Sequence, residues 1–148
     1  MEKRFTKIYE TNKWGNNHAV KYQGSSGPGS TLEYNQSTYI PFLKQFITNN
    51  NIKTVVDLGC GDFICGKSIY DDLDVKYIGY DTYKKLVDCH STQYPSPKYS
   101  FIHLEFCKNK EEIVNGDLCI LKDVIQHWSL NHIYKLLDYL TEQKKFKY

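Results

Sequence analysis

The residues best suited to chemistry are two aspartates and two glycines near the middle of the chain. Asp57 ends a β-branched apolar run, and Gly59 and Gly61 follow it directly, before a segment that is typical of a helix. Glycine lets the backbone bend at such a turn and lets a ligand lie directly on it. Asp81 ends a second apolar run twenty residues beyond Gly61, where its carboxylate can accept from both hydroxyls of a ribose. The spacing favours a nucleoside pocket over the alternative that Asp81 only caps the next helix.

Two features of this turn disfavour a dinucleotide. The dinucleotide fingerprint Gly-x-Gly-x-x-Gly needs a glycine where this chain has Ile64. Asp57 would repel a pyrophosphate, whereas its charge would attract an ammonium or sulfonium group. S-adenosylmethionine is a nucleoside with no phosphate and a cationic amino acid end. The turn therefore favours S-adenosylmethionine, with S-adenosylhomocysteine as product, over NAD or a nucleotide sugar.

The run Val56-Asp57-Leu58-Gly59-Cys60-Gly61 closely resembles motif I of the class I S-adenosylmethionine-dependent methyltransferases, Asp-x-Gly-x-Gly-x-Gly. The last glycine of that motif is Phe63 here. The resemblance implies that Asp57 orients the methionyl ammonium through water or backbone and that Asp81 holds the ribose. It covers residues 54–130, and more weakly 10–50.

Further residues match positions that line the pocket in this family. Leu104 to Phe106 occupy the place of the adenine, with Glu105 for its exocyclic amine and Phe106 for stacking. The run 121–128, Leu-Lys-Asp-Val-Ile-Gln-His-Trp, resembles the segment that lines the methyl-donor and acceptor sides. The cofactor site that the resemblance implies comprises Asp57, Gly59, Cys60, Gly61, Asp81, Thr82, Glu105, Phe106, Lys122 and Asp123.

His127 is the candidate general base, because the ordinary pKa of histidine suits proton removal near neutrality. A packed turn beneath the pocket would explain His127 and Trp128 equally well. If the two residues are functional instead, Trp128 is expected on the acceptor side of the pocket. The run lacks the Asn/Asp-Pro-Pro-Tyr/Phe motif of enzymes that methylate nucleic acid bases. The expected methyl acceptor is therefore a small molecule.

A glycine-rich loop precedes the expected core. Residues 23–30 hold three glycines and a proline within six positions, which rules out regular structure. A flexible arm, or an expression scar at 24–27, would explain it. However, Trp14 is an unusual residue for a loose tail, and Trp14-Gly15 followed by this loop resembles the segment before the first helix in some small class I methyltransferases. We therefore expect a lid that brings Trp14, Gly27 and Gly29 to the acceptor side.

Alternating elements must position these residues. Apolar spacing predicts helices over 36–49 and 129–143, a helix capped by Asp62 that runs to residue 72, and a helix over 82–93. Apolar runs at 54–57, 75–81, 99–105 and 117–123 predict strands. Such alternation predicts one α/β domain, 1–148, with an arm (1–35) and a core (36–148). Its expected fold is a Rossmann-like parallel sheet with helices on both faces. We expect the family's C-terminal strands to be missing, which would expose the fourth strand to self-association.

Composition excludes several classes of protein. The net charge is +2, too weak to imply nucleic acid or membrane binding by itself. No apolar run approaches a membrane span, residues 1–10 hold no signal-peptide core, and the five cysteines form no Cys-x-x-Cys pair, which predicts a cytoplasmic location. His103, Glu105 and Cys107 share one strand face, but no second cluster completes a metal site, so no metal is expected. A non-catalytic nucleoside-binding or assembly module remains the alternative function.

Overall fold

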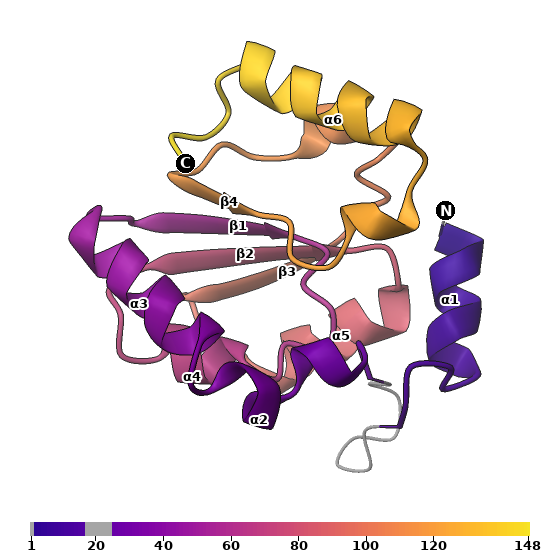
Figure 1. The fold of residues 1–148 in the computed structure, drawn as a ribbon, viewed down its shortest axis with the longest axis horizontal. Helices are drawn as coiled ribbons and strands as arrows, with labels where there is room; N and C mark the ends of the chain where they lie inside the picture. Colours follow the sequence, from indigo (N-terminus) through magenta and orange to yellow (C-terminus); the bar gives the residue numbers. More distant parts are fainter. Residues whose placement is uncertain (1, 17–24) are drawn as a thin grey trace.

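A four-stranded parallel sheet forms the centre of the computed structural model, which describes residues 2–16 and 25–148 (Figure 1). Its strands are β1 (Thr54–Leu58), β2 (Lys76–Asp81), β3 (Tyr99–His103) and β4 (Leu118–Ile120), in the order β3-β2-β1-β4. The central strands β1 and β2 bury side chains on both faces of the sheet, among them Val55, Val56 and Tyr77, which are fully buried. All four strands are parallel, so their carboxyl ends lie at one edge of the sheet.

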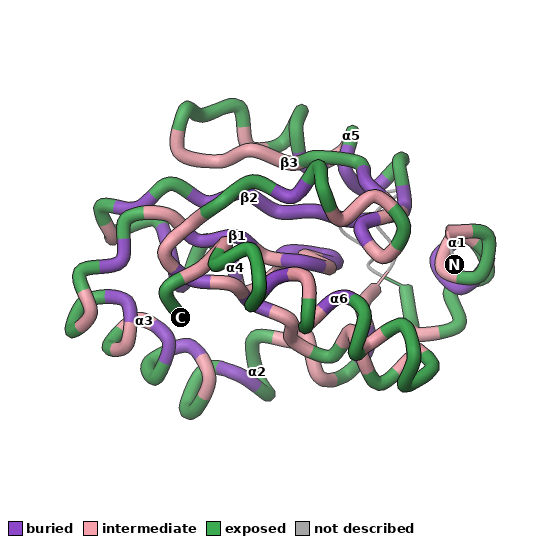
Figure 2. The backbone as a smooth tube through the Cα atoms, turned by 90° about the horizontal axis from the view of Figure 1, so that it is seen from above, coloured by how far each residue is buried: buried purple, intermediate pink, exposed green. Residues whose placement is uncertain are grey.

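Helices cover both faces of the sheet. Helices α3 (Tyr39–Asn49), α4 (Gly66–Tyr70) and α5 (Lys84–Gln93) lie on one face, and α6 (Leu130–Glu142) lies on the other (Figure 1). Alternate residues of β1 face opposite ways, so Val55 packs in the cluster under α3 and Val56 in the cluster under α6. Figure 2 shows the central strands as the most continuously buried part of the chain. The predicted α/β class with helices on both faces is confirmed.

Several expected boundaries need correction. Asp62 does not cap the helix after the glycine turn, because α4 begins at Gly66 after Cys65. The delay has a backbone cause: Phe63 takes the left-handed φ of +54°, which a helix cannot include. The other differences are shorter elements, with β3 ending at His103, β4 spanning only Leu118–Ile120, and α5 starting at Lys84.

The N-terminal region is more ordered than its composition predicts. It contains α1 (Glu2–Glu10), the 3₁₀ turn η1 (Pro28–Ser30) and α2 (Leu32–Asn35). Helix α1 buries Ile8 and Tyr9. Figure 1 places α1 beyond the carboxyl ends of the strands, so this helix lies beside the edge where a ligand site is expected.

The last residues of the chain pair with the edge strand. After the 3₁₀ turns η2 (Lys110–Glu112) and η3 (Ile125–His127) and helix α6, Phe146 forms a parallel bridge with Gly116. The Cys119 N–H donates to the Tyr148 carbonyl over 2.9 Å. The fourth strand was expected to be exposed at the sheet edge. Residues 145–148 instead cover its beginning, so it is not exposed along its whole length.

Candidate functional site

One cavity of about 400 Å³ lies at the carboxyl ends of the strands. This volume is within the range of small-molecule pockets. Its wall includes every predicted site residue, from all parts of the chain: Trp14, Gly27, Gly29, Asp57, Gly59, Cys60, Gly61, Asp81, Thr82, Glu105, Phe106, Lys122, Asp123, His127 and Trp128. The structure thus brings these residues together around one cavity, and placement at the wall does not by itself assign a role.

The glycine turn is fixed by bonds from two other elements. Gly59 and Gly61 have φ values of +98° and +54°, which only glycine adopts readily. The Gly61 N–H donates to Asp81 Oδ2 over 3.1 Å, and the Gly61 carbonyl lies 2.8 Å from His90 Nε2. His90 is fully buried, and burial lowers its pKa, so the neutral ring holds the turn from α5. The turn is therefore rigid before any ligand binds.

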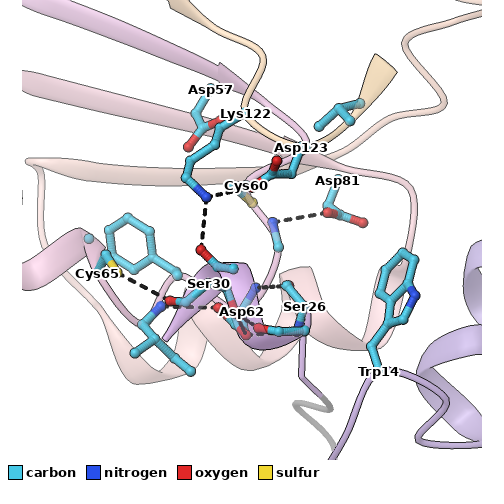
Figure 3. Close-up of a pocket in the computed structure, with 18 of the residues that line it drawn as sticks. Trp14, Ser26, Ser30, Asp57, Cys60, Asp62, Cys65, Asp81, Lys122 and Asp123 are labelled. Carbon is cyan, nitrogen blue, oxygen red and sulfur yellow. Dashed lines mark hydrogen bonds and ion pairs between the residues drawn. The ribbon is translucent and has the colours of Figure 1, made fainter. Parts of the chain in front are cut away.

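The role expected for Gly61 needs correction. Gly61 was expected to let a ligand lie on its backbone, but a Cβ there would overlap the Ser26 hydroxyl. Asp62 explains this arrangement, because its Oδ2 accepts from the Ser26 N–H at 2.7 Å and from the Ser30 hydroxyl at 2.8 Å (Figure 3). Asp62 is 2% exposed, so the acceptor end of these bonds is buried. The glycine-rich loop, described from residue 25 onward, is packed onto the turn and is not a free arm.

Asp81 keeps acceptor capacity for a ligand. Its Oδ2 accepts from the Gly61 N–H and its Oδ1 from the Tyr83 N–H at 3.0 Å. A carboxylate oxygen has two lone pairs, so each oxygen can accept a second hydrogen bond. Burial raises the pKa of Asp81, while the backbone bonds act against this rise. The geometry is compatible with the predicted ribose contact.

Asp57 lies at the other side of the turn, among tyrosines. The Tyr77 hydroxyl donates to Asp57 Oδ2 over 2.8 Å. Burial raises the pKa of Asp57 to about 7, although the Tyr77 bond and the Lys122 charge act to lower it. An additional cation in the cavity would favour the ionised form. The Asp57 site is therefore compatible with a positively charged group.

Lys122 and Asp123 follow β4 and connect it to the glycine-rich loop. The Lys122 ammonium donates to the Gly29 carbonyl at 2.9 Å and to Asp123 Oδ2 at 2.6 Å (Figure 3). It also lies 5.4 Å from the centre of the Tyr39 ring. Asp123 has a φ of +57°, a strained value for a residue with a side chain, and such strain is common at functional sites.

The predicted adenine side holds unpaired polar atoms. Glu105 is 13% exposed at its side chain and pairs with Lys108 at 2.9 Å, and the Phe106 ring lies 5.5 Å from the Trp128 ring. Within residues 2–16 and 25–148, Thr82 Oγ1 and Trp128 Nε1 are buried without a hydrogen-bond partner. Buried polar atoms normally have partners, so these two atoms favour a polar ligand in the cavity. The residues present therefore fit a nucleoside cofactor.

An aromatic outer wall, formed by Phe5, Trp14 and His127, closes the cavity beside α1. The His127 ring lies 5.2 Å from the Trp14 ring and 5.8 Å from the Phe5 ring. Partial burial lowers the pKa of His127, and the nearby Arg4 charge lowers it further. Sequence analysis found His127 and Trp14 but missed Phe5, Tyr9, Ser26 and the loop contact of Asp62. The spacing of Phe5, Ile8 and Tyr9 was the available signal for α1.

The described residues show neither a metal centre nor a membrane helix. No three His, Cys, Asp or Glu side chains of ranges 2–16 and 25–148 lie close enough together to hold a metal ion. His103 Nε2 instead lies 3.1 Å from the Thr82 carbonyl. No helix within the described part of the chain has the length and apolar character needed to cross a bilayer.

Comparison with known proteins identifies the fold. No protein-family model and no curated protein matches the chain. The methyltransferase domain of bacterial CtHen1-C matches with a TM-score of 0.58 at 16% identity, over 68% of this chain and 56% of that one. Magnesium protoporphyrin IX methyltransferase (ChlM) from Synechocystis PCC 6803, solved with bound SAM, matches with a TM-score of 0.59 at 12% identity, over 95% of this chain and 70% of that one. The pyocyanin biosynthetic protein PhzM matches with a TM-score of 0.54 at 16% identity, over 72% of this chain and 33% of that one.

The fold is that of the class I S-adenosylmethionine-dependent methyltransferases, α/β and Rossmann-like. The resemblance drawn from the glycine turn and Asp81 is thereby confirmed at the level of fold. The chain spans 56% of the CtHen1-C domain, which is little more than half its length.

Proposed function

We propose that this chain is an S-adenosylmethionine-dependent methyltransferase that acts on a small molecule. The charge of the cavity wall carries the proposal. Among the described residues, five carboxylates line the cavity, from Asp57, Asp62, Asp81, Glu105 and Asp123, and one lysine, Lys122, opposes them. Glu105 pairs with Lys108, and Asp123 pairs with Lys122. The attraction therefore comes chiefly from Asp57 and Asp81, whose ionised forms are favoured by a cationic nucleoside and disfavoured by a diphosphate.

The chain's own residues divide the binding task. When bound, S-adenosylmethionine supplies a methyl group on a positively charged sulfur. Asp81 accepts hydrogen bonds from the ribose, and Asp57 stabilises the cationic amino acid end. Thr82 Oγ1 and Trp128 Nε1 bind polar atoms of the adenosine, and Phe106 packs against its base. These assignments use the buried atoms that have no protein partner and the carboxylates that retain free lone pairs.

His127 accepts the proton of the methyl acceptor in this proposal. Its lowered pKa keeps the ring neutral near pH 7, so that it can act as a base. With S-adenosylmethionine bound, the acceptor would attack the methyl carbon in line as the methyl–sulfur bond breaks and S-adenosylhomocysteine leaves; the chain's residues would contribute mainly by positioning the two reactants. A base contributes only where the acceptor must lose a proton.

Thermal unfolding with S-adenosylhomocysteine tests the cofactor assignment. At about a hundred times its dissociation constant, the ligand should stabilise the chain by roughly 2.7 kcal/mol, which raises the Tm by several degrees. NAD at the same concentration should leave the Tm unchanged. A shift with NAD and none with S-adenosylhomocysteine would contradict the proposal.

A non-catalytic nucleoside-binding module is the second candidate. One observation favours it: the ring of His127, the candidate base, packs against the rings of Trp14 and Phe5, as a purely structural aromatic cluster would. Incubation with labelled S-adenosylmethionine and a cell extract separates the two. Transfer of label to a small-molecule fraction supports the enzyme, whereas tight binding without transfer to any fraction supports the module.

We further propose a reducing, cytoplasmic setting. All five cysteines are free thiols, and Cys60 and Cys65 lie in the cavity wall. Proteins of oxidising compartments commonly pair their cysteines, which supports this location.

A further inference from the structure

Helix α1 distributes its charges unequally between the protein and the solvent. Its acidic residues contact the body of the fold, Glu10 through Lys85 at 2.9 Å and Glu2 near His103 at 3.6 Å. Its basic residues Lys3, Arg4 and Lys7 are exposed, and none has a carboxylate partner among the described residues. The helix therefore presents uncompensated positive charge beside the cavity.

Arg4 is the one of these three residues that contacts the cavity wall. Its Nη1 donates to the His127 carbonyl over 3.1 Å, which anchors the guanidinium at the aromatic outer wall. Its charge also acts on the His127 ring, as the lowered pKa of His127 indicates. A guanidinium presents its N–H donors as a planar fork, and within the described residues this one has no acceptor besides the His127 carbonyl.

We propose that Arg4 and the aromatic outer wall bind an oxyanion, a carboxylate or a phosphate, on a small methyl acceptor. That the bound molecule is a methyl acceptor rests on the proposed function. The presence of an anion site at Arg4 does not depend on it. Oxyanions match the Arg fork in geometry and charge. The apolar faces of Phe5 and Trp14 give the body of such a molecule a surface to pack against.

The charge of the cavity explains why the anion binds outside it. The inner wall holds five carboxylates and one lysine among the described residues, and two of the five, Glu105 and Asp123, are paired with lysines. Asp57 and Asp81, which form no ion pair within the described residues, disfavour an anion there. An acceptor with its oxyanion on Arg4 would keep that group at the rim and direct its uncharged end inward, past His127. The opposite charges of rim and interior would thus orient the acceptor.

Binding of small probes tests the site. Isothermal titration should show phenyl phosphate and benzoate binding more tightly than inorganic phosphate, and phenol binding weakly or not at all. Arg4→Gln should lower the affinity for phenyl phosphate by about tenfold, which is the effect of losing a charge-assisted hydrogen bond. Lys3→Gln is the matched control, because it removes the same charge from an exposed site on the same helix, and it should change binding by less than about twofold.

The NMR titration of His127 provides a readout that a purely structural role would not change. Arg4 from α1 and Asp123 from the segment after β4 are the charged groups that act on this ring. Phenyl phosphate should raise the pKa of His127 in the native protein, because it offsets the Arg4 charge, and should have no effect in Arg4→Gln. Equal weakening by Lys3→Gln and Arg4→Gln, or no binding of either aromatic anion, would overturn the proposal.

The two proposals fail separately. If S-adenosylhomocysteine raises the Tm but phenyl phosphate does not bind, the anion site is wrong and the methyltransferase proposal stands. If phenyl phosphate binds through Arg4 but S-adenosylhomocysteine does not, the anion site stands without that function.

Discussion

The inner glycine turn and the aromatic outer wall enclose the same cavity by different means. The turn is held by hydrogen bonds: Gly61 contacts Asp81 from β2 and His90 from α5, and Ser26 lies over it. The outer wall is held mainly by ring contacts, such as those of Trp14 with Phe5, Tyr9 and His127. Hydrogen bonds fix positions closely, whereas ring contacts tolerate sliding. The difference suggests a fixed inner site for one cofactor and an adaptable outer site for the acceptor.

Removal of Asp81 should produce the largest effect on the inner site. Asp81→Ala deletes the proposed ribose acceptor and also frees the Gly61 N–H, so affinity for S-adenosylhomocysteine should fall by about a hundredfold or more. Titration calorimetry measures this. Asp81→Asn, which keeps one acceptor oxygen, should lose less. An unchanged affinity in Asp81→Ala would show that Asp81 only supports the turn.

Loss of Asp62 should separate the loop from the turn. Asp62→Ala leaves the Ser26 N–H without its acceptor, whereas the Ser30 hydroxyl can still donate to the Gly27 carbonyl at 2.8 Å, so the free energy of unfolding should fall by about 1 to 3 kcal/mol. Denaturant unfolding measures the change, and limited proteolysis should find new cleavage near residues 25–30. Asp62→Asn is the control that retains an acceptor. A loop that stays protected in Asp62→Ala would mean that other contacts hold it.

Replacement of Asp57 should stabilise the ligand-free protein and weaken the binding of the ligand. The pKa of Asp57 is about 7 in the folded chain, above the ordinary value near 4 in the unfolded chain. Its ionisation therefore costs stability progressively as pH rises from about 4 to 7, and fully above pH 7. Asp57→Asn removes this cost, so at pH 8 the variant should gain up to about 4 kcal/mol in its free energy of unfolding, with little gain at pH 4. A variant less stable at pH 8 would show that the carboxylate itself is needed for folding.

Trp14 should give the smallest effect and the clearest contrast with the inner site. Trp14→Ala removes ring contacts with Phe5 and His127, yet it touches none of the bonds that fix Gly61. Affinity for S-adenosylhomocysteine should fall only about threefold, whereas phenyl phosphate should bind about tenfold more weakly. Trp14→Phe keeps an aromatic surface and should preserve most of the binding of both. A large loss of affinity for S-adenosylhomocysteine would place Trp14 on the cofactor side of the cavity.

The same contrast shows how far sequence reasoning reached. Glycines at 59 and 61 and a carboxylate at 81 leave a local signature, because the backbone conformation and the strand spacing both restrict the residue types allowed. The predicted end of the second strand and the beginning of the third match the structure. The sheet was therefore readable.

The contacts that pack the N-terminal region and the glycine turn together were less readable, because they join segments far apart in the chain. Asp62 looked like a helix cap, but its buried partners lie 32 and 36 residues away in the chain. Helix α1 was overlooked in a region rich in charge, although Phe5, Ile8 and Tyr9 have helical spacing. Phe63, which replaces the last glycine of motif I, fills an aromatic cluster with Tyr77 and Phe101, and this compensation is visible only in three dimensions.

The pairing of residues 145–148 with β4 has a practical consequence for handling the protein. Tyr148 accepts a hydrogen bond from Cys119 and its ring lies 5.4 Å from the Phe46 ring, while Glu2 at the other end already belongs to α1. A purification tag fused directly at either terminus would therefore adjoin ordered structure. A flexible glycine-serine spacer at the carboxyl terminus, followed by the tag, should preserve melting behaviour, and a directly fused tag offers the comparison.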